Sequence, residues 1–228
     1  MATLAERVSD AQTRIDAAAA AAQRNSSNIT LLAVSKTKPA QMVVEAYQAG
    51  CRHFGENYLQ EGVAKITELS QLEHAIWHFI GPLQSNKTRQ VAEHFDWMHT
   101  LDRLKIAQRL NEQRPADKPP LNVCLQVNIS GESSKSGVTV AELPQLAQAV
   151  AALPQLRLRG LMAIPAATTD VAAQRNAFAQ LRQQFEQLQC QHPQLDTLSM
   201  GMSGDMDAAI IEGSTMVRIG TAIFGARN

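Results

Sequence analysis

Hydrophobic and polar residues follow two different rhythms along this chain of 228 residues. In the opening segment, apolar residues recur at steps of three and four, which predicts one face of a helix. These residues are Leu4, Val8, Ala11, Ile15, Ala18 and Ala22. A polar run at 24–28 ends this pattern. From residue 30 onward, short β-branched or apolar runs alternate with helical stretches, and each run ends in a small or polar residue.

Eight of these runs are predicted to be strands. They cover residues 30–35, 52–55, 76–81, 97–101, 121–128, 156–163, 196–200 and 215–220. Helices are expected between them. Pro39 suits a first helical turn, and Gly50 and Gly213 suit the position just after a last turn. The stretch 171–189 carries apolar residues at helical spacing.

Eight strand–helix units of about 28 residues each predict a parallel sheet, because parallel strands need crossover helices. We therefore expect a single (β/α)8 TIM barrel with an extra N-terminal helix, forming one domain over residues 1–228 with no long linker. An open doubly wound sheet is the alternative. It would favour a glycine-rich turn after the first strand, whereas the turn SKTKP has no glycine, and neither a GxGxxG nor a GxxxxGK[ST] motif is present.

The amino-acid composition argues against several classes of partner and against a membrane location. The 21 basic and 21 acidic residues balance, so there is no electrostatic reason to expect nucleic acid or an anionic membrane as a partner. Cys51, Cys124 and Cys190 are scattered and predict no disulfide framework, which favours a reducing cytoplasm. The opening lacks the apolar run of a signal peptide, and no apolar stretch reaches the roughly 18 residues of a membrane span.

Lys36 is the first candidate for chemistry. Barrel enzymes build their sites at the carboxyl ends of the strands, and Lys36 directly follows the first predicted strand. Apolar neighbours would disfavour its charged form, and an uncharged amine attacks an aldehyde to form a Schiff base. The alternative is a lysine that reaches solvent at the barrel rim, with Lys38 as an equally plausible neighbour.

The loops after the last two strands are candidates for holding a phosphate. Barrels often bind phosphate there through backbone N–H groups, and both loops, 199–206 and 218–225, are rich in glycine. Ser203 and Thr221 add hydroxyl donors. Two ordinary turns, one of them capping a helix from Gly204, are the alternative. Asp205 and Asp207 would also repel an anion unless they point away.

Arg218 stands inside the apolar run MVRIG, where a charge is rarely buried without a partner. A carboxylate is at least as good a candidate partner as a ligand. A lysine that traps an aldehyde, a phosphate cradle and an inward arginine nevertheless together describe a pocket for pyridoxal 5'-phosphate (PLP), in which one residue must face the pyridine nitrogen.

Several blocks of the sequence carry a resemblance to a known family. They read LLAVSKTKP, HFGENYLQE, WHFIGPLQSNK, LRGLMAIP and LSMGMSGDM followed by GSTMVRIGTAIFGAR, within residues 30–227. Together they resemble the pyridoxal phosphate homeostasis protein family (the YggS type, also called PROSC). The resemblance implies the barrel of the alanine racemase N-terminal domain, fold type III among PLP proteins, with PLP as cofactor.

The resemblance also implies roles for single residues. It makes Lys36 the lysine that carries PLP as an internal aldimine. It places Ser203, Gly204, Gly220 and Thr221 at the phosphate, Arg218 at the pyridine nitrogen, and Asn57, His78 and Met200 along the ring.

A carrier of PLP is favoured over an enzyme. A guanidinium beside the pyridine nitrogen opposes its protonation and so weakens the cofactor as an electron sink. Racemases offset this with a second base, but the two tyrosines, Tyr47 and Tyr58, fall in helical stretches, and only Tyr58 is close to the mouth. We therefore expect a cytoplasmic monomer, without robust catalysis and without a second domain before its end at Asn228, that buffers PLP in vitamin B6 homeostasis and delivers it to apo PLP-dependent enzymes. The alternative is a fold type III amino acid racemase.

Other interpretations are weaker. An aldolase-like enzyme would use Lys36 without PLP. A metal site would need His74 and His78, which are too far apart on a strand to chelate one ion easily. Lys135, in the loop 131–137, is either a transient acceptor of PLP or part of a solvated turn, and we favour the turn. Glu56 is expected to cap the helix that follows it.

Overall fold

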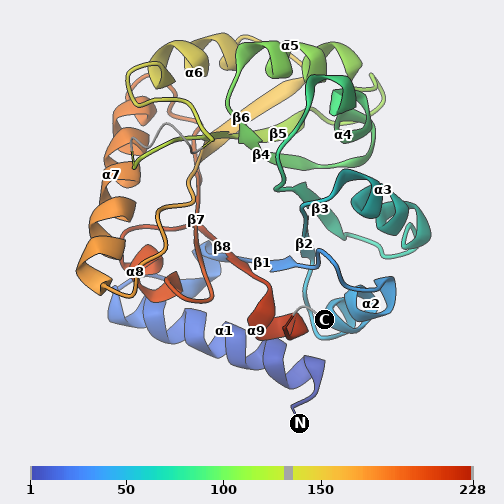
Figure 1. Ribbon diagram of the computed structural model, residues 1–228, viewed down its shortest axis with the longest axis vertical. Coiled ribbons are helices and arrows are strands. Elements are labelled where there is room, and N and C mark those ends of the chain that lie inside the picture. The colour runs from blue at the N-terminus through green and yellow to red at the C-terminus, as the bar shows by residue number, and fades with distance from the viewer. Residues whose placement is uncertain (1, 131–135, 227–228) are drawn as a thin grey trace.

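Eight parallel strands form a closed barrel in chain order (Figure 1). The computed structural model describes residues 2–130 and 136–226. The strands are β1 (Thr30–Val34), β2 (His53–Glu56), β3 (Ile76–Phe79), β4 (Trp97–Leu101), β5 (Leu121–Gln126), β6 (Leu156–Met162), β7 (Thr197–Met202) and β8 (Met216–Ile219). Because β8 pairs with β1, the sheet has no open edge, and the predicted TIM barrel is confirmed over the doubly wound sheet.

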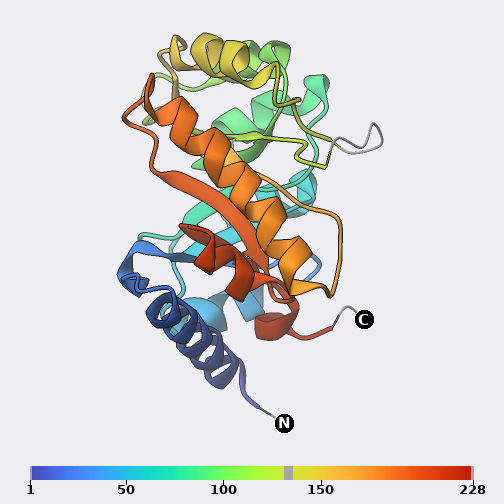
Figure 2. The same cartoon turned by 90° about the vertical axis from the view of Figure 1, so that its left-hand side faces the viewer.

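Helices connect the strands and cover the outside of the barrel. They are α1 (Leu4–Ala21), α2 (Ala40–Gln48), α3 (Leu59–Glu68), α4 (Thr88–His94), α5 (Leu104–Gln113), α6 (Leu143–Ala151), α7 (Val171–Gln189), α8 (Met206–Ile211) and α9 (Thr221–Phe224), with 3-10 turns η1 (Ser26–Asn28) and η2 (Ser85–Lys87). Figure 2 shows α7 running along the outside of the barrel beside α8. Within the described ranges, no helix combines the length and the hydropathy needed to cross a membrane.

The extra N-terminal helix is present, as predicted. Helix α1 begins with a capping box, in which Thr3 and Glu6 each accept a hydrogen bond from the other's backbone N–H. Its buried face packs against α8, α9 and α2, so it lies beside the elements that follow β7 and β8 (Figure 1). Helix α1 therefore supports the end of the chain where the phosphate loops were predicted.

The predicted helix boundaries hold closely. Pro39 is the N-cap of α2, and Gly50 and Gly213 follow α2 and α8 with φ of 102° and 100°, a left-handed conformation that favours glycine. One boundary differs, since α8 begins at Met206 rather than at Gly204. The runs at 76–81 and 121–128 also extend past β3 and β5, because their last residues leave the sheet to form loops at the carboxyl mouth.

Strand alternation sends neighbouring residues to opposite sides of the barrel wall. The outward side carries the large apolar core between strands and helices, including Phe54, Phe79 and Met98. The inward side is unusually polar, with the buried side chains of His78, His99, Ser199 and Arg218.

Candidate cofactor-binding site

The loop that carries Lys36 is fixed at the carboxyl end of β1. Lys36 is half-buried and lies two residues past the strand. On one side of it, the Ser35 N–H donates to the Gly55 carbonyl at 3.0 Å. On the other, Thr37 has a φ of 61°, and its N–H donates to Glu61 Oε1 at 2.6 Å. Lys38, the alternative lysine, donates from Nζ to the Ala226 carbonyl at 2.7 Å.

A buried ion pair lies beneath this loop. Lys65 Nζ donates to Glu56 Oε1 at 2.8 Å, to Glu61 Oε1 at 2.7 Å and to the Ser35 carbonyl at 2.7 Å. The Ser35 hydroxyl donates to Glu56 Oε1 at 2.6 Å. Burial raises the pKa of Glu56, although its contact with Lys65 lowers it. The network thus ties both sides of the Lys36 loop to β2 and α3.

One sequence interpretation is wrong here, and one residue of the network was missed. Glu56 was expected to cap the next helix, but it is the last residue of β2 and fully buried, while α3 starts at Leu59 with Tyr58 as its N-cap. Lys65 was not predicted as a functional residue. The available signal was its place three residues after Gly62 on α3, since the two share the buried face of that helix.

The two predicted phosphate loops present unused backbone donors. Within residues 2–130 and 136–226, the N–H groups of Ser203, Gly204, Gly220 and Thr221 have no hydrogen-bond partner. A Cβ on Gly204 would meet no atom within 4 Å, so this turn is open on that side. Unused amides on two adjacent loops are the donors that a phosphate needs.

The neighbouring aspartates are engaged elsewhere. Asp207 accepts from Arg14 Nε and Nη2 at 3.1 and 2.7 Å, and Asp205 Oδ1 accepts from the Met202 N–H at 2.6 Å. Arg14 Nη1 also donates to the Ser203 carbonyl at 2.7 Å. The charge of Asp207 is therefore paired with Arg14, the carboxylate of Asp205 is bound to a backbone N–H within its own turn, and Arg14 of α1 fastens the turn from outside.

Replacing Arg14 with alanine should loosen this turn. Because the pair with Asp207 is exposed, we expect the loss of affinity for a phosphate-bearing ligand to stay within about fivefold. Equilibrium titration with PLP would measure it, with Arg89→Ala as the control, because the Arg89–Glu93 pair is an exposed contact within α4. Equal affinity of both variants and the parent chain would contradict a role for Arg14.

Arg218 is a buried cation without a carboxylate partner. Its Nη1 donates to the Ser199 carbonyl at 2.6 Å and to Ser199 Oγ at 2.9 Å, and its Nη2 donates to the Ala163 carbonyl at 3.0 Å. Burial lowers the pKa of Arg218 to about 10. Within the described ranges no carboxylate forms an ion pair with Arg218, although the charge of Asp205 partly raises its pKa, so the carboxylate partner considered from the sequence is not in direct contact.

The three residues predicted along the ring lie in different places. Asn57 lies at the mouth and lines a cavity of about 570 Å³ together with Ile80 and Thr100. The backbone of Asn57 packs directly against that of Gly81, because a Cβ on Gly81 would lie only 2.0 Å from the Asn57 carbonyl oxygen. His78 is inside the barrel and fully buried.

Met200 lies in the apolar layer between strands and helices. This agrees with strand alternation, because its neighbour Ser199 points inward to Arg218, although the pairing of β7 with β8 is irregular between Ser199 and Met202. This place in the wall argues against the predicted contact between Met200 and a ring.

Of the remaining candidates, only Tyr58 lies near the mouth among the described residues. Tyr47 donates its hydroxyl to the Glu73 carbonyl, whereas Tyr58 is 51% exposed and lines a cavity beside Asn57. His74 lies in the turn before β3. Among the residues with described positions, no group of three or more His, Cys, Asp or Glu could hold a metal ion. Lys135 lies outside the described residues.

Comparisons with known proteins give the family. Residues 12–228 match the family model described as alanine racemase, N-terminal domain. A protein of Pseudomonas aeruginosa named pyridoxal phosphate homeostasis protein is 62% identical over 228 residues, covering 100% of this chain and 97% of its own length. A protein of Escherichia coli K12 with the same name is 60% identical over 227 residues, covering 99% and 97%. The chain belongs to the pyridoxal phosphate homeostasis protein family.

Solved structures agree with this membership. PipY of Synechococcus elongatus, solved with PLP bound, is 40% identical, with a TM-score of 0.80 over 98% of this chain and 100% of that one. Alanine racemase of Corynebacterium glutamicum is 17% identical, with a TM-score of 0.67 over 97% of this chain and 61% of that one, which shows a shared fold. The resemblance to the pyridoxal phosphate homeostasis protein family and the alanine racemase barrel are thus confirmed.

Proposed function

We propose that this chain binds PLP reversibly through Lys36 and serves as a carrier or buffer of PLP in vitamin B6 homeostasis. One observation carries the proposal. The carboxyl end of the barrel brings together the fixed loop of Lys36, the four unused amides of the phosphate loops and the buried cation Arg218.

These groups fit the chemistry of PLP. When bound, PLP supplies an aldehyde that condenses reversibly with an uncharged amine and releases water. Lys36 is the amine in this proposal, and the N–H groups of Ser203, Gly204, Gly220 and Thr221 hold the phosphate. Asn57 lines the mouth beside the ring in this proposal. His78 lies inside the barrel, where it is hydrogen-bonded to His53 and His99. The relatives named pyridoxal phosphate homeostasis protein and the PipY structure with PLP bound support this assignment.

Arg218 favours binding over catalysis. Its guanidinium offers only N–H donors, so it donates to the lone pair of a ring nitrogen and leaves no acceptor for a proton there. The groups around Arg218 do not reverse this, because they are carbonyl and hydroxyl oxygens rather than a carboxylate. An unprotonated ring nitrogen is a weak electron sink, and we therefore propose a protein without robust catalysis.

The proposal also covers the domain organisation, the oligomeric state, the compartment and the acceptors of PLP. We propose a single barrel domain over residues 1–228 that acts as a monomer in the cytoplasm and hands PLP to apo PLP-dependent enzymes. The free thiols of Cys51, Cys124 and Cys190 support a reducing compartment. A fold type III racemase is the competing function, with Tyr58 at the mouth as its available base.

Exchange of the α-proton separates carrier from racemase. The chain loaded with PLP is incubated in D2O with a panel of L- and D-amino acids, and NMR follows loss of the α-proton signal. The proposal predicts the same exchange as with free PLP at equal concentration. Faster exchange that disappears in both Lys36→Ala and Tyr58→Phe would establish the racemase instead.

A further inference from the structure

Five polar side chains from five strands form an unbroken hydrogen-bonded series through the barrel. His53 Nδ1 lies 2.9 Å from His78 Nε2, and His78 Nδ1 lies 2.9 Å from His99 Nε2. His99 Nδ1 lies 2.8 Å from Ser199 Oγ, which accepts from Arg218 Nη1 at 2.9 Å. His78, His99 and Ser199 have no exposed surface. Buried polar groups in series cost free energy unless each one is satisfied, so the order of donors matters.

Arg218 fixes the direction of the whole series. A guanidinium can only donate, so Ser199 Oγ must accept from it. Among the described residues, the other partner of Ser199 Oγ is His99 Nδ1, and the proton of this fully buried hydroxyl has an acceptor there only if the hydroxyl donates to that nitrogen. The proton of neutral His99 is then on Nε2 and is donated to His78.

The same donor–acceptor reasoning applies to His78 and then to His53. His78 accepts at Nδ1, so its proton is on Nε2 and is donated to His53 Nδ1. His53 in turn carries its proton on Nε2. Each of the three histidines is therefore the Nε2–H tautomer, a result that follows from the donor-only guanidinium of Arg218 together with the need of the buried Ser199 hydroxyl for an acceptor.

The far end of the series reaches the opposite mouth of the barrel. His53 is half-buried and lines a cavity of about 570 Å³ at the amino ends of the strands. His53 Nε2 has no hydrogen-bond partner in the described ranges, yet it is not among the buried polar atoms left unpaired, so water reaches it. The series thus runs from Arg218 to solvent on the side away from Lys36.

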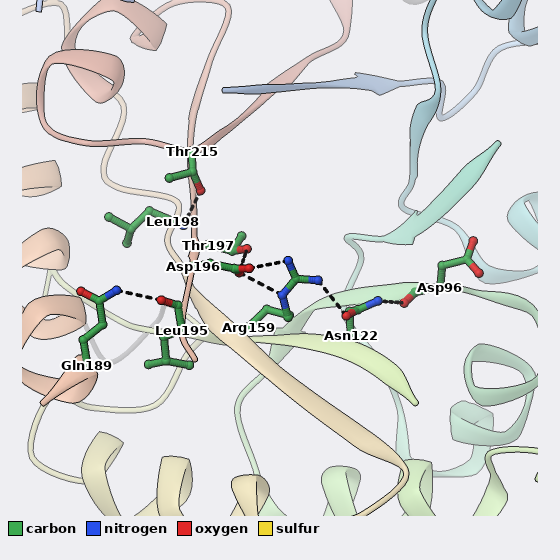
Figure 3. A network of polar contacts seen from close by, with 9 residues as sticks. All are labelled: Asp96, Asn122, Arg159, Gln189, Leu195, Asp196, Thr197, Leu198 and Thr215. Atoms are coloured by element: carbon green, nitrogen blue, oxygen red, sulfur yellow. Dashed lines mark hydrogen bonds and ion pairs between the residues drawn. The ribbon is translucent and has the colours of Figure 1, made fainter. Parts of the chain in front are cut away.

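The charged groups around this cavity are already paired. Figure 3 shows Arg159 between Asp196 and Asn122. Its Nε and Nη2 donate to the two carboxylate oxygens of Asp196 at 2.9 and 2.6 Å, and its Nη1 donates to Asn122 Oδ1 at 3.0 Å. Trp97 lies under the guanidinium of Arg159 and stacks on His78. No unpaired carboxylate therefore faces His53 to favour its protonation within the described cavity wall.

Electrostatics keep the three histidines uncharged. Burial lowers the pKa of His53, and it lowers the pKa of His78 well below its usual value, helped by His99 and His53. Burial, then the charge of Arg218, lowers the pKa of His99 to about 3. The three histidines are thus neutral at physiological pH and do not themselves compensate the charge of Arg218, whose pKa the charge of Asp205 partly raises.

We propose that His53, His78 and His99 form a directional hydrogen-bond chain that orients Ser199, and through it Arg218, toward the ring-nitrogen side of bound PLP. This inference rests on the proposed function for its ligand, but the direction of the chain is a property of the protein without PLP. The three histidines are positioning residues. They replace the carboxylate that would otherwise orient a buried arginine, and they do so without neutralising it.

The tautomers test the chain without any ligand. In protein carrying 15N-labelled histidine and no PLP, NMR should show His53, His78 and His99 as neutral Nε2–H tautomers at pH 7, with His78 and His99 still neutral at pH 5. His74, His94 and His192 lie outside the series and serve as internal references. An Nδ1–H tautomer at any of the three, or a charged His99 at pH 5, would overturn the chain. These outcomes do not depend on whether the protein binds PLP.

A double-mutant cycle tests the effect on the site. Ser199→Ala removes the bridging hydroxyl but keeps the carbonyl contact with Arg218, and His53→Phe cuts the chain at its far end. Each change should raise the dissociation rate of PLP about threefold and shift the pH profile of the PLP absorbance. The double variant should dissociate at the same rate as Ser199→Ala alone. His94→Phe, at the end of α4, is the control. Rate effects of His53→Phe and Ser199→Ala that multiply would overturn a shared chain.

Discussion

Replacing Lys36 with alanine is expected to lower the affinity of the chain for PLP about 100-fold, equivalent to about 3 kcal/mol. The reason is the loss of the only covalent attachment in the proposal, while the phosphate loops and Arg218 remain. Equilibrium dialysis with PLP measures the change, and the visible absorbance of lysine-bound PLP should vanish with it. No other single substitution at the mouth is expected to weaken binding as much.

Lys38 provides a matched control for this change. It lies two residues away on the same loop, and its amine is bound to the Ala226 carbonyl. Lys38→Ala should keep the absorbance and bind within a few-fold of the parent chain. If Lys36→Ala kept the absorbance and Lys38→Ala lost it, Lys38 rather than Lys36 would be the lysine that binds PLP.

Replacing Lys65 with methionine is expected to reduce the free energy of unfolding by about 3–5 kcal/mol, because it leaves the Glu56 carboxylate buried without its cation. Denaturant unfolding measures this. Glu61→Gln is the control, since the Glu61 side chain is 28% exposed and its loss should cost much less. The double variant Glu56→Gln, Lys65→Met removes both charges and should recover much of the stability.

The loss in Lys65→Met should depend on pH with a definite sign. Burial raises the pKa of Glu56 above its ordinary 4.5, and removing Lys65 raises this pKa further. The folded state then binds the Glu56 proton more tightly than the unfolded chain, so stability falls as pH rises. The defect should be smallest below pH 4.5 and grow above it. A defect that shrinks as pH rises would mean that Glu56 is not the buried charge left behind.

The sequence pattern predicts the barrel because strand and helix periodicities reflect which side chains face the apolar layer. Helix α7 was predicted with its observed bounds, since its apolar stripe is not interrupted. The ends of β3 and β5 were placed too late, because apolar residues continue into loops at the mouth where no partner strand follows.

The site was predicted less completely. Lys36 and Arg218 were identifiable because one follows a strand and the other interrupts an apolar run. The histidine series was not, because His53, His78 and His99 come from three strands and meet Ser199 only after the barrel closes. Met200 was placed on the ring by resemblance, whereas the alternation along β7 turns it outward. Pairings across a closed barrel depend on register, which periodicity alone does not encode.

The position of the covalent bond to PLP decides whether Lys36 is the lysine that holds it. The purified chain is saturated with PLP, reduced with borohydride to make the attachment permanent, digested and mapped by mass spectrometry. We expect a phosphopyridoxyl group on the peptide of the SKTKP turn, with fragment ions assigning it to Lys36 alone. A modified lysine elsewhere in the chain with Lys36 unmodified would contradict this assignment.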